Sequence, residues 1–498
     1  MKKIIVLLLC AFFVLVFFAA CEKEDASAPK ESDPTTIVEP ADPGNQKPAD
    51  LCNHEWTLSA FVTEETEVPF AGKFICEKCE NEEIRSISYT DIEIPLISLI
   101  GDVSPFRSEW GDFNKDVKVP ANFLYESSDM SLKCAATLKL QGKSTASEDK
   151  YNFSVNLLDS ETGDKKKVVF QEEWGKGYKY VLKSNYCDPS AVRNISVACL
   201  YGQMAHELDI QDHYSNLVNC GAVDGYPVLV YLNGKYQGLY NWVIRKDKWL
   251  YGMGDDAAGE AVLAGSDMSA LKSDEGIVIL PEELRSSKSW KEEYVNESYG
   301  DEGWAEESFN EMLSKIKSAN AEQIRAIIAE YIEVERTLDV MLLNSVFGTT
   351  DNVCGNQVWC TFDGKKWAPV VYDHDRALGR SGHSFIDPLE NILELIEQNI
   401  LYDIIMNAYL AEIAGRYIAL RQSVFTVENV MSIIHEKQSG LDERYFKAEL
   451  EKWPKASWLD YDESYLITGF DVELQIIENY LEERFVCCDA FFSSIAMG

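Results

Sequence analysis

The apolar pattern of this chain changes character partway along its length, and that change limits the folds it can adopt. In the first half, short β-rich runs are bounded by turn residues; residues 228–232 and 239–244, for example, flank Asn233-Gly234. Asn-Gly between two such runs indicates a β-hairpin with a tight turn. In the second half, residues 321–347 carry apolar side chains at helical spacing. Strands first and helices second predict an α+β body with two lobes, the first strand-rich and the second helical.

The same reasoning places the other regular segments of a body that we expect to span residues 90–498. Strands are expected within residues 92–100, on both sides of Gly142 within residues 138–157, and at residues 178–182. Helices are expected within residues 388–421, 427–450 and 472–494.

The N-terminus has the features of an export signal. Lys2 and Lys3 precede an apolar run over residues 4–18, which ends in two alanines directly before Cys21. The run is short for a membrane span, and its order of charge, apolar core and small residues is typical of a secretory signal peptide. A cysteine directly after the small residues predicts a lipoprotein signal over residues 1–20, with lipid on Cys21 as the membrane anchor. The alternative is an ordinary signal peptide with a chance cysteine at this position.

The N-terminus also predicts where the protein is located. Acyl chains on Cys21 would hold an exported chain to the cell envelope. The acidic run over residues 21–25 resembles the sorting signals of surface lipoproteins in some Gram-negative anaerobes, which favours the outer membrane or the cell surface. Residues 21–50 are rich in Pro, Ala, Asp and Glu and have almost no large apolar side chains, so we expect them to form a disordered tether.

The charge balance excludes one class of partner. The chain has 83 acidic residues against 46 Lys and Arg, a formal charge of −37 at pH 7. A field of this sign repels the phosphates of nucleic acids and of anionic lipid surfaces. We therefore expect no nucleic-acid partner, and we expect the membrane to be reached through the lipid on Cys21.

A small unit over residues 51–89 contains two cysteine motifs. Cys52 and His54 form a Cys-x-His pair, and Cys76 and Cys79 form a Cys-x-x-Cys pair. Three thiols and an imidazole are a ligand set that tetrahedral zinc accepts, and a unit this short needs such a crosslink to fold. Its role would be structural, because four protein ligands leave no open position for catalysis. Disulfides or free thiols remain the alternative here, and the irregular spacing of the other cysteines predicts no disulfide framework.

Residues 349–379 concentrate the polar groups that chemistry would need. A polar loop carries Asp351 and, five positions later, Asn356; a short hairpin follows, with Asp373 and Asp375 at the end of its second strand. In a phosphoryl-transfer site one carboxylate positions the attacking hydroxyl, while an amide and a second carboxylate hold the divalent ion at the nucleotide phosphates. The hairpin would bring Asp351, Asn356 and Asp373 together, which indicates such a site. Alternatively, these groups cap turns or bind a structural cation.

Four segments of the chain share their pattern with one known family. They are residues 140–145 (LQGKST), the region from Leu182-Lys183-Ser184 to Arg193-Asn194, residues 231–240 (YLNGKYQGLY) and residues 350–379. The most specific patterns are Asn-Gly-x-Tyr-x-Gly-x-Tyr in the third segment and Asp-x-Asp-x-x-x-Gly at the end of the fourth. On these residues the body resembles the spore-coat-protein-H (CotH) kinase family, an atypical branch of the protein-kinase-like fold. The neighbouring residues 241–253 resemble a subgroup of surface lipoproteins.

This resemblance implies an activity and assigns roles to individual residues. It implies Mg²⁺- or Mn²⁺-dependent transfer of phosphate from ATP to Ser or Thr of an exported protein. Asp351 would be the catalytic base, and Asn356 and Asp373 would be the metal ligands. Asp375 would assist Asp373 or replace it.

Two departures from the family pattern concern the residue that binds the nucleotide. Active members usually carry Glu at the position of Ile244, where it can pair with a phosphate-binding lysine. The family often has adjacent lysines where this chain has Lys150 followed by Tyr151. Lys150 is the candidate nucleotide lysine, and Lys143 in the glycine-containing loop is the alternative. The departures leave two functions open: an atypical kinase, or a kinase-like surface scaffold that has lost transfer and serves adhesion or binding.

Overall fold

A computed structural model describes residues 52–107, 113–142, 148–254, 259–265, 290–381, 384–389, 392–456 and 467–497. The expected signal peptide, the expected lipidation site Cys21, the expected tether and Lys143 lie outside the described residues. Within the described ranges, no helix combines the length and the apolar character needed to cross a bilayer.

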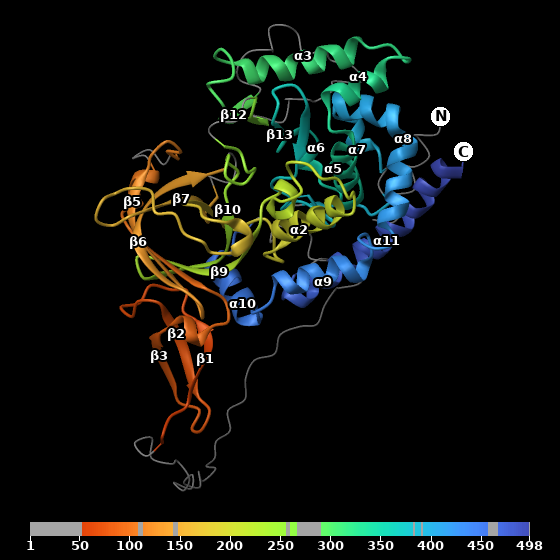
Figure 1. Ribbon diagram of the computed structural model, residues 1–498. Coiled ribbons are helices and arrows are strands. Elements are labelled where there is room, and N and C mark those ends of the chain that lie inside the picture. Colours follow the sequence, from red (N-terminus) through yellow and green to blue (C-terminus); the bar gives the residue numbers. More distant parts are fainter. Residues whose placement is uncertain are drawn as a thin grey trace, which may run out of the picture. The chain divides into compact units, whose positions relative to one another are not determined.

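The strands of the first half close into a barrel (Figure 1). Their order around the barrel is β10-β8-β7-β6-β5-β4-β9; β4 and β9 are parallel, and the other neighbours are antiparallel. Closure gives every strand two partners, so the barrel has no open edge. The strands are β4 (Leu96–Ile100), β5 (Val119–Glu126), β6 (Ser131–Gln141), β7 (Asn152–Leu158), β8 (Lys179–Lys183), β9 (Gly225–Leu232) and β10 (Lys235–Ile244).

The predicted hairpin is present as strands β9 and β10. Leu232 and Lys235 pair across the turn at Asn233-Gly234, where φ is 53° and 78°. Positive φ at both central residues is what a type I′ turn requires, and Asn and Gly adopt it at the lowest cost. Trp242 of β10 stacks with Tyr180 of the neighbouring strand β8 at 4.7 Å between ring centroids, and both rings are buried.

A separate three-stranded sheet precedes the barrel in the chain. It consists of β1 (Trp56–Phe61), β2 (Ala71–Cys76) and β3 (Glu82–Ser86) in that order, all antiparallel. Its apolar face shares a core with the barrel and with helix α10 (Glu443–Lys452). The ring of Phe61 packs against Tyr236 of β10 and Tyr445 of α10, with ring centroids 5.7 Å and 4.8 Å apart. The sheet therefore joins the turn end of the barrel to a helix near the other end of the chain.

The second half of the chain is mainly helical, with a small antiparallel sheet whose order is β12-β11-β13-β14. Its strands are β11 (Ala261–Gly265), β12 (Trp290–Val295), β13 (Val358–Thr361) and β14 (Trp367–Val370), and the pair β15 (Arg380–Ser381) and β16 (Ser384–Phe385) follows them. The helices, beside α10, are α2 (Arg193–His206), α3 (Trp304–Ser318), α4 (Ile324–Tyr331), α5 (Val334–Phe347), α6 (Thr350–Cys354), α7 (Glu394–Glu397), α8 (Ile400–Leu420), α9 (Val427–Lys437) and α11 (Phe470–Met497).

The mixed α+β class is as predicted, but two local expectations differ from the structure. Residues 321–347 form two helices, α4 and α5, because the chain is extended at Ile332-Glu333, where it pairs with Trp367 of β14. Asp351 lies in the short helix α6 instead of a loop, since the amide of Asn356 donates to the carbonyl of Asp351 at 3.1 Å and closes the turn. Among the described cysteines no disulfide is formed.

A buried cluster of charges ties the last helix to the rest of the body. Glu473 of α11 forms ion pairs with Arg193 of α2 and with Arg380, and Arg193 also bonds to Asp188 at 2.6 Å. Burial raises the pKa of Glu473, but the two guanidinium groups outweigh it and lower the pKa below its usual value. Asp188 and Arg193 are therefore structural partners.

Candidate functional site

The end of strand β14 brings the expected site residues to the barrel. The chain leaves the strand through Tyr372 and turns at Asp373, whose φ of 63° is in the left-handed region. A non-glycine residue in this region is uncommon, and such residues cluster at functional sites. The Asp373 carboxylate forms an ion pair with Lys183, the last residue of β8.

Lys183 and Asp373 stabilise one another's charge. Burial alone lowers the pKa of Lys183, but Asp373, Tyr372 and Asp375 outweigh it, and the pKa lies well above its usual value. Burial likewise raises the pKa of Asp373, but Lys183 and then Lys246 bring it below the usual range. Both groups are therefore charged at pH 7.

A second lysine lies beside the same acid. The ammonium of Lys246 lies 4.1 Å from the centroid of the Tyr372 ring, and Lys183 lies 5.9 Å from that centroid. Contact of an ammonium with an aromatic ring is attractive and holds the cation in place. Lys246 also lies 3.3 Å from a carboxylate oxygen of Glu293. Two cationic groups thus flank Tyr372 next to Asp373.

Asp375 is half-buried and differs from Asp373 in its electrostatics. Burial, with the negative charge of Asp373 as the next cause, raises the pKa of Asp375 to about 7. The attraction of Lys183 and of Arg376 only partly offsets these effects. The raised pKa of Asp375 therefore reflects mainly its burial, and the nearby carboxylate of Asp373 adds to the shift.

His374, between the two acids, is buried and neutral. Its Nε2 lies 3.2 Å from the Asn344 side-chain oxygen, and its Nδ1 lies 3.3 Å from the Asn352 side-chain nitrogen. These partners place the proton on Nε2, which donates to Asn344, while Nδ1 accepts from Asn352. Burial lowers the pKa of His374 to about 3. The backbone amide of His374 donates to Asn194 of α2 at 2.8 Å, so the residue fixes the segment that carries both acids.

Asp351 is linked to the same segment through Arg376. The Arg376 guanidinium lies 3.0 Å from a carboxylate oxygen of Asp351, and both side chains are partly exposed. Burial lowers the pKa of Arg376, but the negative charges of Asp351, Asp375 and Asp373 contribute to raising it above its usual value. The three expected carboxylates are thus gathered around Lys183 and Arg376.

Asn356 is less closely connected to the acids than the spacing predicts. It lines a small cleft together with Asn352, Tyr372 and His374. Among the residues that the structure describes, its side chain makes no hydrogen bond with Asp373. The amide that touches this segment is Asn352, which donates to the carbonyl of Tyr372 at 2.6 Å.

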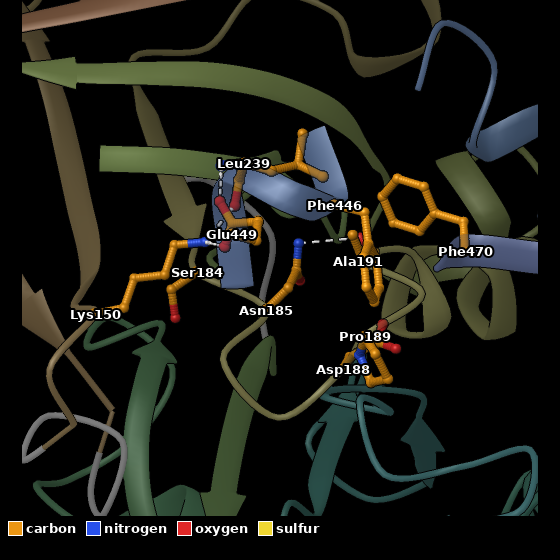
Figure 2. A pocket seen from close by; sticks show the side chains of 10 residues that line it. All are labelled: Lys150, Ser184, Asn185, Asp188, Pro189, Ala191, Leu239, Phe446, Glu449 and Phe470. Carbon is orange, nitrogen blue, oxygen red and sulfur yellow. Dashed lines mark hydrogen bonds and ion pairs between the residues drawn. The ribbon is translucent and has the colours of Figure 1, made fainter. Parts of the chain in front are cut away.

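Lys150 lines a neighbouring pocket and is held there by residues of the barrel and of α10 (Figure 2). Its ammonium donates to Glu449 of α10 at 2.7 Å and to the carbonyl of Leu239 at 2.6 Å, and it lies 4.7 Å from the Tyr240 ring centroid. Burial lowers the pKa of Lys150 and raises that of Glu449, and their mutual attraction opposes both shifts. The Lys–Glu pair of this chain therefore joins the barrel to α10.

Ile244, at the position where active members usually carry Glu, is buried opposite Tyr180 on β8. The carboxylate partner of Lys150 comes instead from Glu449, in a helix that is remote in sequence.

Sequence reasoning did not assign roles to Lys183 and Lys246. Lys183 lies one residue beyond the strand predicted at residues 178–182, and it belongs to one of the four segments that resemble the family. Nothing in its local sequence indicates that Asp373 is its partner. Lys246 lies just beyond strand β10 and has no motif of its own.

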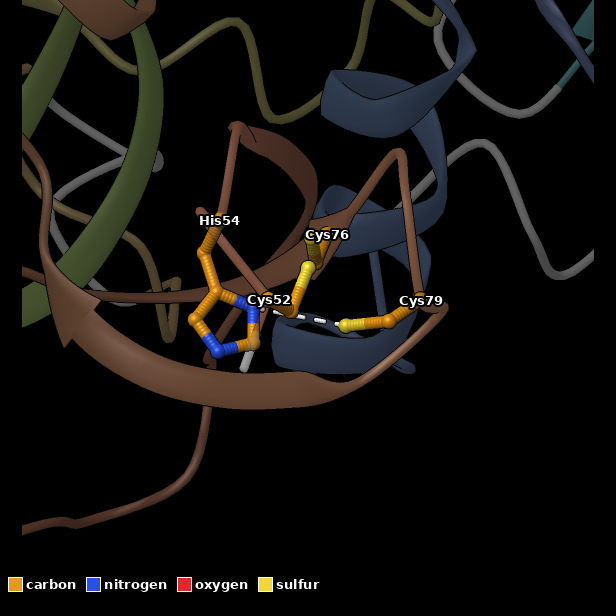
Figure 3. A group of neighbouring side chains, drawn as sticks. All are labelled: Cys52, His54, Cys76 and Cys79. Atoms are coloured by element: carbon orange, nitrogen blue, oxygen red, sulfur yellow. Dashed lines mark hydrogen bonds between the residues drawn. The ribbon is translucent and has the colours of Figure 1, made fainter. Parts of the chain in front are cut away.

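The four predicted zinc ligands converge at the tip of the three-stranded sheet (Figure 3). The ligand atoms of Cys52, His54, Cys76 and Cys79 all lie within 4.8 Å of one another. Burial opposes ionisation of Cys76, but hydrogen bonds from the Lys78 amide, from His54 and from other backbone amides lower the pKa of this thiol to about 6. The group lies outside the acidic site described above.

Comparison with known proteins places the acidic site within a known protein family. No curated protein matches the chain. The family model for the CotH kinase protein matches residues 138–487, a range that includes Lys183, Asp351, Asp373 and Asp375. The match covers more than half of the 498 residues. The chain therefore belongs to the CotH kinase protein family, and a kinase-like function is what that membership indicates.

Proposed function

We propose that this protein is an atypical kinase that transfers the γ-phosphate of ATP to Ser or Thr of an exported protein. The observation that carries the proposal is the convergence of Lys183 and Asp373, from distant parts of the chain, with Asp375 and Asp351 close by. Phosphoryl transfer depends mainly on positioning and on compensation of charge, and this set contains both acids and cations for those tasks.

Asp351 is assigned the role of the base. Its partly exposed carboxylate is held by Arg376 and can accept the proton of an incoming hydroxyl. In the transfer the hydroxyl oxygen bonds to the γ-phosphorus, the bond from that phosphorus to the bridging oxygen breaks, and ADP leaves. Arg376 keeps the carboxylate oriented while the hydroxyl approaches.

Asp373 and Asp375 are the residues that would hold Mg²⁺ or Mn²⁺, with Asn356 supplying an amide oxygen from the adjoining cleft. The donor set fits, because hard divalent cations prefer carboxylate and amide oxygens. The two acids also lie close enough for the charge of Asp373 to add to the effect of burial on the pKa of Asp375, which supports a shared site. When bound, the ion would neutralise charge on the nucleotide phosphates.

Lys183 and Lys246 are assigned to the phosphates of the nucleotide. Both ammonium groups lie at Tyr372, next to Asp373, where the phosphates of a metal–nucleotide complex would lie. Lys183 also forms an ion pair with Asp373. Lys150 is not assigned this role, because Glu449 and the Leu239 carbonyl already occupy two of its three donors and its side chain is buried.

We propose, as part of the same function, a two-lobed kinase-like arrangement and an exported, lipid-anchored location. In the kinase-like interpretation the barrel takes the place of the N-terminal lobe, and the helical half takes the place of the C-terminal lobe. The chain would be exported and held to the envelope by lipid on Cys21, in a surface-lipoprotein subgroup of the family. Its acceptor would then be a protein in the same compartment.

A kinase-like scaffold without transfer is the second candidate. The observations that favour it are the apolar Ile244 at the usual Glu position and the engagement of Lys150 by Glu449. A scaffold, however, does not account for the two further acids, Asp375 and Asp351, that lie beside the buried Lys183–Asp373 pair.

Transfer of labelled phosphate distinguishes the two candidates. The full chain is incubated with γ-labelled ATP, Mn²⁺ and casein as a generic acceptor, in parallel with Asp351→Asn and with the control Asp116→Asn, whose side chain is fully exposed. We expect label on the acceptor or on the chain itself, a loss of about 10²–10⁴-fold in Asp351→Asn, and no loss in the control. A chain that binds ATP but transfers no label would contradict the kinase proposal and support the scaffold.

A further inference from the structure

We propose that Cys52, His54, Cys76 and Cys79 bind a structural zinc ion at the tip of the β1–β3 sheet. This site is independent of the phosphoryl-transfer proposal, because it lies outside the range that the family model matches. The ligand set is three sulfurs and one imidazole nitrogen.

The spacing of the ligand atoms fits one shared ion. In a tetrahedral site with Zn–S of 2.3 Å and Zn–N of about 2.0–2.1 Å, neighbouring ligand atoms lie about 3.6–3.8 Å apart. The sulfur of Cys79 lies 3.3 Å from Nδ1 of His54, and all four ligand atoms lie within 4.8 Å of one another. Four protein ligands complete the coordination of zinc, so the site is closed to substrate.

The imidazole distinguishes this arrangement from a disulfide. A bond between two of the three sulfurs would leave the third unpaired and would give His54 no reason to face them. In Figure 3, His54 points toward the sulfur of Cys79. Trp56 stacks on the imidazole with ring centroids 4.9 Å apart, which fixes the orientation of His54. The Arg85 guanidinium carbon lies 4.4 Å from the centroid of the Trp56 ring.

The backbone holds the two cysteine motifs in place for an ion. Cys76 ends strand β2, and the chain turns back at once: the amide of Glu80 donates to the Cys76 carbonyl, and the amide of Cys76 donates to Asn81, both at 2.9 Å. The amide of Glu77 donates to the carbonyl of Glu55 at 2.9 Å, which connects the turn to the Cys-x-His segment. The ligands therefore project from a hydrogen-bonded framework.

The ion would stabilise more than the tip of the sheet. A unit of about forty residues rarely closes a core without a metal, a disulfide or a partner. The sheet rests on α10, where Arg444 donates to the Leu58 carbonyl at 2.7 Å. The same helix carries Glu449, which bonds to Lys150 of the barrel region. Zinc at the tip would therefore help to hold the sheet against α10.

Metal content and thiol state test the proposal directly. The full chain, purified without chelators or added metal, is analysed for zinc by elemental mass spectrometry, and its thiols are counted after denaturation without reductant. We expect one zinc per chain and reduced Cys52, Cys76 and Cys79. Cys79→Ser should lose the zinc. The matched control is Cys487→Ser, a half-buried cysteine of α11, and it should retain the metal.

Replacement of zinc by Co²⁺ keeps the test decisive if Cys79→Ser fails to fold. The cobalt form should show thiolate-to-metal charge-transfer absorption and the visible bands of a tetrahedral site. His54→Cys should still bind one ion, with both sets of bands shifted to longer wavelength. A chain without zinc in which these cysteines are disulfide-bonded, or cobalt bound without charge-transfer bands, would overturn the proposal.

Discussion

Lys183 and Asp373 form an ion pair although 190 residues separate them in the chain. The lysine ends a strand of the barrel, and the acid follows a strand of the small sheet in the helical half. Their contact defines where the two halves meet at the candidate site. Both side chains are largely buried, with 12% and 22% of their surface exposed. We attribute a function to this pair because Asp375, Lys246 and Tyr372 lie beside it.

The two candidate lysines should respond differently to the same substitution. Lys183→Met should abolish the effect of ATP and Mn²⁺ on thermal stability, because it removes a proposed phosphate ligand. Lys150→Met should destabilise the fold by about 3–5 kcal/mol, because it leaves the buried Glu449 carboxylate unpaired.

Denaturant unfolding measures the second effect, and Lys150→Met/Glu449→Leu provides its control. Removal of both charges should restore part of the lost stability. If instead Lys150→Met keeps its stability but loses the nucleotide effect, while Lys183→Met retains that effect, the assignment of the lysines is reversed.

Gly238→Ala should destabilise the protein more than a glycine substitution normally does. Gly238 has φ of 106°, and a Cβ there would meet the Glu449 carboxylate that pairs with Lys150. Gly163→Ala is the matched control, since Gly163 also has a positive φ, of 75°, but a Cβ there would have no neighbour within 4 Å. The difference in unfolding free energy between the two variants measures the steric effect. Equal losses would mean that the approach of Glu449 does not explain this glycine.

The Glu473 cluster should make stability depend on pH in a defined direction. The folded state lowers the pKa of Glu473, so its charge contributes stability above the ordinary value of 4.5, and this contribution is lost as the pH falls below that value. Glu473→Gln should therefore lower the free energy of unfolding by about 3–5 kcal/mol at pH 7. This gap between the variant and wild type should narrow below pH 4.5.

Urea unfolding at a series of pH values measures this gap. The control is Glu482→Gln, an exposed residue of the same helix, which should follow wild type throughout. A Glu473→Gln gap that stays constant or widens on acidification would contradict the assigned role of the carboxylate.

The sequence predicted those features that local chemistry determines. The hairpin at Asn233-Gly234 follows from turn geometry, and the approach of Asp351 to the Asp373 segment follows from a short hairpin between them. The spacing did not reveal that Asn352, rather than Asn356, would contact that segment, because the short helix α6 turns the intervening residues.

Pairings between distant residues were beyond sequence reasoning. Closure of the barrel depends on the parallel pairing of Leu96 with Leu229 in β4 and β9, for which no turn signal exists. The contact of Lys150 with Glu449 joins residues 299 positions apart. Such contacts are set by packing of the whole body, and a single sequence contains no local pattern that marks them.

Asp373 and its neighbours are proposed to form a metal–nucleotide site, and thermal melting of the full chain with and without ATP plus Mn²⁺ shows whether they do. A ligand at 100 times its Kd adds about 2.7 kcal/mol of stability, which is measurable as a higher melting temperature. We predict this shift for wild type and for Asp116→Asn, and no shift for Asp373→Asn or for Mn²⁺-free samples. A wild-type chain that does not shift, or an Asp373→Asn variant that shifts as wild type does, would contradict the account.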